Sequence, residues 1–191
     1  MMVTALSATH PITFRPFDIE RDASMVFGWV QNPHAQYWGM LDSTFSDFIA
    51  VYTELLAIPR YQIYIGEIQG RALFLMEAYN PTTDGIGEHY TVLEGDWGMH
   101  VLVAPPEKRI HGLTWHIFTG IMDFLFDQPS CKRVIVEPDV NNEKIHRLNK
   151  KAGFEYQYEV VMPHKTAHLA FCTAEQYQQA ILIESSSNLI Q

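Results

Sequence analysis

The stretch that most constrains the fold runs from Gly98 to Phe126 and reads GMHVLVAPPEKRIHGLTWHIFTGIMDFLF. Its apolar run ends at Val103, and a proline-rich basic loop follows. After Gly112, apolar residues recur at the spacing of one helix face: Leu113, Ile117, Ile121 and Leu125. The pattern therefore predicts a strand, a loop and a helix. The first N–H groups of a helix lack intrahelical partners and lie at the positive end of its dipole, so a donor-rich loop at this position favours an anion site.

The chain has 191 residues, which is enough for a substantial core in one domain. We expect a single domain over residues 12–183, a loose N-terminus over residues 1–11 and a disordered, serine-rich tail over residues 184–191. The net charge of −9 argues against general nucleic-acid binding and against binding to an anionic membrane surface.

Basic residues are nevertheless concentrated in one part of the sequence. Eight of the 13 lie between residues 108 and 151: Lys108, Arg109, Lys132, Arg133, Lys144, Arg147, Lys150 and Lys151. A local positive field on an acidic chain suits a compact polyanionic ligand. The alternative is a set of solvated helix and strand ends, which we favour for Lys132 and Arg133.

The cysteine and histidine patterns bear on redox state and metal binding. Cys131 and Cys172 are the only cysteines in the sequence, and no secretory signal is recognisable, so we expect reduced thiols and a cytoplasmic location. No apolar run approaches transmembrane length. The nine histidines include no H-E-x-x-H motif and no Cys or His pair at zinc spacing, so we expect no metal.

Hydrophobic periodicity predicts the order of the elements. Strands are expected over residues 12–17, 61–68, 72–79, 96–103, 133–137, 154–162 and 166–171. Helices are expected from Asp18 to about residue 30, from Thr44 to a stop at Pro59, over residues 112–126 and 141–152, and for a short stretch after Thr173. The order β-α-α-β-β-β-α-β-α-β-β predicts an α/β, three-layer domain around a central mixed, mostly antiparallel sheet.

His100 is the candidate general base. Side chains alternate along a strand, which places His100 with Asp96, Gly98 and Leu102 on a mixed face, opposite an apolar one. A near-neutral imidazole is well suited to accept a proton from an attacking nitrogen. The alternative is a half-buried histidine bonded to a backbone carbonyl.

Asp139 is the candidate partner of that base. It lies in Glu137-Pro138-Asp139-Val140-Asn141-Asn142, directly after a predicted strand. A carboxylate there would hold the second nitrogen of a histidine, set its tautomer and stabilise the imidazolium. The alternative is that Asp139 or Asn141 caps the next helix.

The aromatic cluster His34, Tyr37 and Trp38 is the candidate wall of an acceptor pocket, since flat rings suit an alkyl chain or a cation. The alternative is that these residues are core aromatics beneath the first loop.

Two sets of motifs resemble a known family. Arg109-Ile110-His111-Gly112-Leu113-Thr114 resembles the R/Q-x-x-G-x-G/A pyrophosphate loop of GNAT-type acyl-CoA N-acyltransferases, although Thr114 departs from the small last residue. The order of the elements resembles the GNAT fold over nearly the whole chain. Five segments, in family order and at family spacing, further resemble the siderophore-biosynthesis branch of that family (aerobactin, desferrioxamine and mycobactin type). The segments are His34-Ala35-Gln36-Tyr37-Trp38, Gly95-Asp96-Trp97-Gly98-Met99-His100, Glu137-Pro138-Asp139-Val140-Asn141-Asn142, Arg147-Leu148 and Gly153-Phe154.

The resemblance implies a GNAT fold and a reaction in which acyl-CoA, carrying acetyl or succinyl, acylates an N-hydroxylated diamine or N6-hydroxylysine to a hydroxamate. It implies that His100 is the base and Asp139 its partner. The expected coenzyme A contacts are Val101, Leu102, Val103, Lys108, Arg109, His111, Gly112, Leu113, Thr114 and Asn142. The expected acceptor contacts are His34, Tyr37, Trp38, Glu88 and Asp96, with Glu94 as a further carboxylate.

Two other functions stay open. An ordinary amine, such as an aminoglycoside, would use the same carboxylates to bind a polycation. A non-catalytic acyl-CoA-binding module would keep the fold without the chemistry. We expect a monomer or homodimer.

Overall fold

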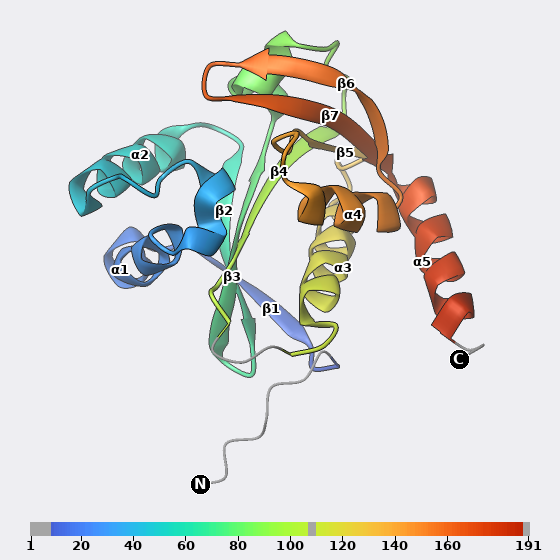
Figure 1. The fold of residues 1–191 in the computed structure, drawn as a ribbon, viewed down its shortest axis with the longest axis horizontal. Coiled ribbons are helices and arrows are strands. Elements are labelled where there is room, and N and C mark those ends of the chain that lie inside the picture. The colour runs from blue at the N-terminus through green and yellow to red at the C-terminus, as the bar shows by residue number, and fades with distance from the viewer. Residues whose placement is uncertain (1–8, 107–109, 189–191) are drawn as a thin grey trace, which may run out of the picture. The chain divides into compact units, whose positions relative to one another are not determined.

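The structure is a computed structural model, which describes residues 9–106 and 110–188 (Figure 1). The chain forms two compact units, each made of two segments: unit 1 comprises Met1–Ala78 and His100–Ile121, and unit 2 comprises Tyr79–Met99 and Met122–Gln191.

Seven strands form one mixed sheet in the order β1-β2-β3-β4-β5-β7-β6. Their bounds are β1 Ile12–Pro16, β2 Tyr61–Ile68, β3 Arg71–Tyr79, β4 Asp96–Val103, β5 Arg133–Val136, β6 Glu155–Met162 and β7 Lys165–Thr173. The pairs β1/β2, β5/β7 and β6/β7 are antiparallel, whereas β4 and β5 are parallel. The predicted element order and mixed sheet are confirmed.

Five α-helices and three 3-10 helices lie in the described residues. They are α1 Ile19–Val30, η1 Pro33–Trp38, α2 Phe45–Ala57, η2 Pro81–Thr83, η3 Gly85–Glu88, α3 Leu113–Phe126, α4 Glu143–Lys151 and α5 Ala174–Asn188. The last helix is longer than the short one expected, because it continues into residues 184–188, which we predicted as part of the tail. Within the described ranges, no helix is long and apolar enough to cross a bilayer.

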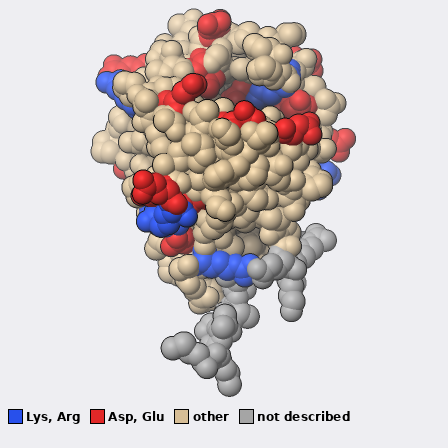
Figure 2. Space-filling view, turned by 90° about the vertical axis from the view of Figure 1, so that its left-hand side faces the viewer, with Lys and Arg blue, Asp and Glu red and all other residues tan. Residues whose placement is uncertain are grey.

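In unit 1, side-chain caps start both long helices of the N-terminal half. Asp18 accepts from the N–H of Arg21 to begin α1, and Thr44 forms a reciprocal capping box with Asp47 to begin α2, as predicted. Figure 1 shows α1 and α2 side by side. Along α2, the apolar residues Phe45, Val51 and Leu56 are exposed. The view onto the side of unit 1 that carries α1 and α2 has a broad uncharged area (Figure 2).

The buried face of α2 carries an aromatic stack that holds Tyr52 in place. Tyr52 is 1% exposed and lies with its ring centroid 4.3 Å from that of Phe48 and 5.4 Å from that of Phe17. These rings are spaced for direct contact. The Tyr52 hydroxyl is therefore held at a defined position beneath the sheet strands of unit 1.

In unit 2, β6 and β7 form a hairpin with Met162 opposite Lys165, so the second strand begins one residue before the predicted start at Thr166. Gly153 ends α4 at a φ of +92°, a conformation that favours glycine at the end of a helix. Thr173 and Gln176 exchange side-chain to backbone hydrogen bonds at the start of α5, as their spacing predicted.

A buried carboxylate in unit 1 indicates that the stability of the fold depends on pH in the acid range. Asp22 is 2% exposed; burial opposes its charge, but hydrogen bonds from Arg15 and Arg21 outweigh it and lower the pKa of Asp22 from 3.8 to about 2. A carboxylate with a lowered folded-state pKa contributes stability that is full above its unfolded pKa and is lost as the pH falls through its folded pKa. The free energy of unfolding should therefore decrease between about pH 4 and pH 2.

The matched variants are Asp22→Asn and, on the exposed side of the same helix, Glu20→Gln. Urea unfolding should show that Asp22→Asn costs on the order of 2 kcal/mol at pH 7 and removes most of the loss between pH 4 and pH 2, whereas Glu20→Gln does neither. Equal acid sensitivity in wild type and Asp22→Asn would contradict this account.

Candidate active site

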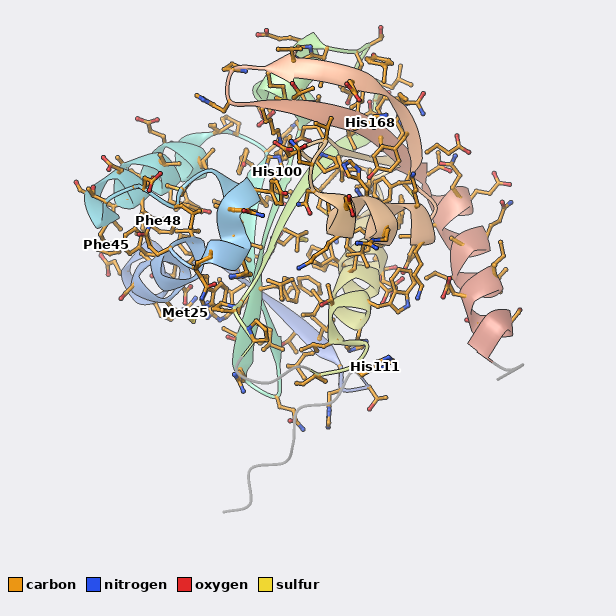
Figure 3. The ribbon with its side chains drawn as sticks, in the orientation of Figure 1. Met25, Phe45, Phe48, His100, His111 and His168 are labelled. Carbon is orange, nitrogen blue, oxygen red and sulfur yellow. The ribbon has the colours of Figure 1, made fainter. Side chains whose placement is uncertain are left out.

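His100 extends from β4 (Figure 3). Its imidazole meets a carboxylate of the neighbouring strand in unit 1. Its Nδ1 lies 3.1 Å from Oε2 of Glu77 on β3. The His100 side chain is 28% exposed, whereas that of Glu77 is 6% exposed. The candidate base is thus accessible on one side and backed by a buried acidic group on the other.

Two phenols complete the surroundings of Glu77. The Tyr52 hydroxyl donates to Oε1 at 3.0 Å, and the Tyr61 hydroxyl donates to Oε2 at 2.7 Å. Burial, together with the charge of Glu77, raises the pKa of Tyr52 well above its ordinary value, so this phenol stays protonated and remains a donor. Helix α2 and strands β2, β3 and β4 therefore converge on one carboxylate.

The predicted acceptor residues of the first loop lie on η1, which Asn32 caps and Pro33 begins. The Trp38 ring meets His100 edge to face, with centroids 6.4 Å apart and planes at 81°. Trp38 also hydrogen-bonds the Tyr52 hydroxyl. Trp38 is therefore tied to the same group of side chains as His100.

His34 and Tyr37, by contrast, are exposed and are not core residues. Nε2 of His34 donates to the carbonyl of Val103 at 2.7 Å, which fastens η1 to the end of β4. The structure thus brings a predicted acceptor residue together with one of the predicted coenzyme A contacts.

The other predicted coenzyme A contacts of unit 1 lie at the end of β4 and the start of α3. Leu102 is buried, whereas Val101 and Val103 are partly exposed. His111 and Gly112 are exposed immediately before α3, and Leu113 and Thr114 form its first turn (Figure 3). Gly112 has a φ of +77°, which a side chain would strain. Lys108 and Arg109 lie outside the described residues.

In unit 2, Asp139 lies in a tight turn before α4. Its Oδ1 accepts from the N–H of Asn141 at 2.8 Å and from Nδ2 of Asn141 at 2.9 Å. The backbone carbonyl of Asp139 accepts from Nε2 of His146 at 2.9 Å. Asn142 caps α4, so neither Asp139 nor Asn141 is the cap that the alternative interpretation required. The catalytic role of Asp139 and coenzyme A binding by Asn142 stay predictions.

Asp96, an expected acceptor contact, takes part in an ion pair within unit 2. Asp96 is 5% exposed, and its two oxygens accept from Nε and Nη2 of Arg133 at 2.8 and 2.7 Å. Tyr90 donates to the same carboxylate at 3.2 Å. A substrate ammonium would have to compete with the partly buried Arg133 guanidinium for this carboxylate, so acceptor binding by Asp96 stays a prediction. Glu88 and Glu94 are exposed, and the acidic rim stays a prediction for these two.

Sequence reasoning missed the residue that contacts His100. Glu77 lies in the strand sequence ALFLMEAY, whose last seven residues, Leu73 to Tyr79, are all buried. A carboxylate in an otherwise apolar buried run needs hydrogen-bond donors, and this signal was available in the sequence. Glu137 in unit 2 is a similar case, because it is 3% exposed and pairs with Lys165 at 3.3 Å.

The described residues contain no group of three or more His, Cys, Asp or Glu side chains placed to hold a metal ion.

Comparison with known proteins identifies the family to which the chain belongs. A family model described as an acetyltransferase (GNAT) domain matches residues 18–162. The chain therefore belongs to the GNAT acetyltransferase family. The structure of AAC(6')-Ib in complex with paromomycin and acetyl-CoA has a TM-score of 0.76 at 26% identity, with 87% of this chain and 96% of that chain covered.

Two curated relatives act on hydroxylated amines according to their names. The chain is 26% identical over 159 residues to N(6)-hydroxylysine O-acetyltransferase of Escherichia coli, which covers 83% of this chain but 50% of that protein. It is 23% identical over 175 residues to N-hydroxyputrescine acetyltransferase of Acinetobacter baumannii, with coverage of 90% and 83%. The chain thus spans half the length of the first relative and most of the second.

Because Gly112 has a positive φ, we expect its substitution to weaken coenzyme A binding. Gly112→Ala places a Cβ in a left-handed conformation, which costs roughly 1–2 kcal/mol, and obstructs backbone approach to the pyrophosphate. Calorimetry should show coenzyme A affinity about tenfold weaker or worse.

Gly28→Ala is the matched control, because a Cβ there meets no atom within 4 Å. It should bind coenzyme A as wild type does. The loop assignment fails if Gly112→Ala, with unchanged circular dichroism, binds coenzyme A normally.

Proposed function

We propose that the chain transfers an acetyl or succinyl group from acyl-CoA to the nitrogen of an N-hydroxylated diamine or N6-hydroxylysine, forming a hydroxamate for siderophore biosynthesis. The observation that carries the chemistry is His100, a partly exposed imidazole backed by the buried carboxylate of Glu77. The names of the two hydroxylated-amine acetyltransferases support the class of acceptor.

The proposed reaction is direct attack within a ternary complex. The hydroxylamine nitrogen forms a C–N bond with the thioester carbonyl, and His100 takes the nitrogen proton as the bond forms. The tetrahedral intermediate then collapses, the C–S bond breaks, and the coenzyme A thiolate leaves. A backbone N–H near Val101 or Leu102 stabilises the oxyanion, which is usually the largest single contribution to acyl transfer. Holding both substrates in place supplies much of the remainder.

The proposed coenzyme A site uses the end of β4 and the start of α3. The pantetheine runs along Val101 to Val103 and pairs with backbone amides, and the pyrophosphate meets the amides of residues 111–114 at the N-terminus of the helix. The proposed acceptor chain lies against Tyr37 and Trp38, and Glu88 or Glu94 binds a far ammonium group. Asp139 is kept as the partner that the family resemblance implies.

Acetylation of an ordinary amine is the second candidate. The similarity to AAC(6')-Ib, solved with paromomycin, favours it, as do the exposed carboxylates Glu88 and Glu94, which suit a polycation. The acceptor experiment below separates it from the first.

The proposed base predicts a large loss on substitution. His100→Ala should lower kcat/KM by roughly two to four decades, the usual contribution of a general base. Asp139→Asn should also lower it, and both variants should still bind coenzyme A. His164→Ala, in the exposed β6–β7 turn, is the histidine control and should keep normal turnover. Near-normal turnover of His100→Ala with the best acceptor would remove the base assignment.

The proposed acceptor predicts a strong preference for hydroxylated amines. An alkylamine with a pKa near 10 is protonated at pH 7 and has no free lone pair, whereas the weakly basic hydroxylamine is mostly neutral. N-hydroxyputrescine and N-hydroxycadaverine should therefore exceed putrescine. They should also exceed N6-hydroxylysine, whose added carboxylate meets Glu88 and Glu94.

The measurement is kcat/KM for each of these acceptors, followed by thiol release from acetyl-CoA and from succinyl-CoA. Kanamycin is included as a representative aminoglycoside acceptor. Equal rates on putrescine and N-hydroxyputrescine would exclude the hydroxamate function. A preference for kanamycin would select the second candidate. A preference for N6-hydroxylysine would keep the reaction but remove the acidic rim.

A further inference from the structure

We propose that Glu77 is a positioning residue for His100: its carboxylate accepts a hydrogen bond from Nδ1–H of the imidazole and so directs the proton that His100 takes during acyl transfer to Nε2. The catalytic part of this inference rests on the proposed function. The assignment of the hydrogen to Nδ1 rests on the contacts of unit 1 alone.

The hydrogen-bond pattern determines which nitrogen carries the hydrogen. Tyr52 donates to Oε1 of Glu77 and Tyr61 donates to Oε2, so the carboxylate acts as an acceptor on both oxygens. An ionised carboxylate has no hydrogen to donate. Nδ1 of His100, at 3.1 Å from Oε2, must therefore carry one. In a neutral ring, the lone pair then lies on Nε2.

The choice of partners distinguishes Glu77 from the other buried carboxylates. Asp22 pairs with Arg15, Asp96 with Arg133 and Glu137 with Lys165. Among the described residues, Glu77 is the buried carboxylate without a lysine or arginine partner. Its charge is thus shared between two phenols and an imidazole, and it is not already neutralised by a fixed cation.

This difference matters when His100 takes a proton. An imidazolium that forms beside an ionised, buried carboxylate is stabilised far more than one in water, because the local dielectric is low. Within the described part of the chain, the pair also contacts the Tyr52 hydroxyl from α2, the Tyr61 hydroxyl from β2 and the edge of Trp38 from η1, and these three groups are uncharged. Glu77 thus both orients the ring and favours its charged form.

The carboxylate is also held still. Tyr52 is fixed between Phe48 and Phe17, and Glu77 is itself 4% exposed. A rigid acceptor fixes ring orientation better than a mobile one, as second-sphere partners of catalytic histidines do. The inference gives Glu77 the orienting role that the family resemblance gives to Asp139, and the two carboxylates are tested against each other.

The first test reads the tautomer directly in the full chain, labelled with ¹⁵N-histidine and assigned with a His100→Gln spectrum. Wild-type His100 should show the Nδ1–H form when neutral. Glu77→Gln, whose amide can donate as well as accept, should reduce that form, whereas Asp139→Asn should leave it unchanged. Wild-type His100 in the Nε2–H form would overturn the proposal, whether or not Glu77→Gln folds.

The second test is the pH dependence of kcat/KM with the best acceptor. Glu77→Gln should lower kcat by about 10–100-fold with little change in KM. Glu77→Gln should also move the acid limb of the pH profile of kcat/KM to lower pH, because the His100 imidazolium loses the negative charge that stabilises it. Tyr61→Phe should cause a smaller loss. Tyr64→Phe, on the same strand but bonded to Gln62, is the matched control and should cause none.

Circular dichroism and coenzyme A calorimetry check that Glu77→Gln is folded. If Glu77→Gln unfolds, Tyr61→Phe, which removes only one hydroxyl, is used to repeat the test. An unchanged acid limb and kcat in folded Glu77→Gln would overturn the proposal. A tautomer that responds to Glu77→Gln in a protein inactive on every hydroxylamine would support the contact and reject the proposed function.

Discussion

A carboxylate that leaves water must be given donors inside the protein, and this requirement shapes the candidate site. Glu77 is satisfied by residues from α2, β2 and β4, which are separated from it by 25, 16 and 23 positions in the sequence. Removing the Tyr52 hydroxyl would take away the donor to Oε1, and a buried acceptor that loses its donor costs about 1–3 kcal/mol. The helix that carries Tyr52 and the strands that carry Tyr61 and His100 are thus linked to each other through one side chain.

The same requirement explains what the acidic residues of the motifs do. Asp96 and Glu137 belong to segments that resemble the siderophore branch, yet in unit 2 each is enclosed with a cation, Arg133 or Lys165. Both ion pairs lie in the part of unit 2 around β5. Glu77 lies in a strand that reads as plain core, and it is the one that touches the candidate base.

Much of the fold was predictable because its signals are local. Helix caps such as Asp18 and Thr44 act within three residues, and strand alternation placed His100 on the mixed face of β4. Gly112 was expected at the start of α3, where its φ is +77°. The partners of His100 and Asp96 were not predictable in this way, because they depend on long-range pairing. Alternation gives the face of a side chain but does not tell what covers that face.

The central claim is that the acyl group reaches the hydroxylamine nitrogen, and the product shows this most directly. Acylation at that nitrogen gives a hydroxamate, which chelates ferric iron with a strong visible absorption, whereas an O-acyl ester or an amide at the far amine does not. With acetyl-CoA and N-hydroxyputrescine, the product should give the ferric hydroxamate absorption in an amount equal to the thiol released. Thiol release with no such absorption would contradict the account.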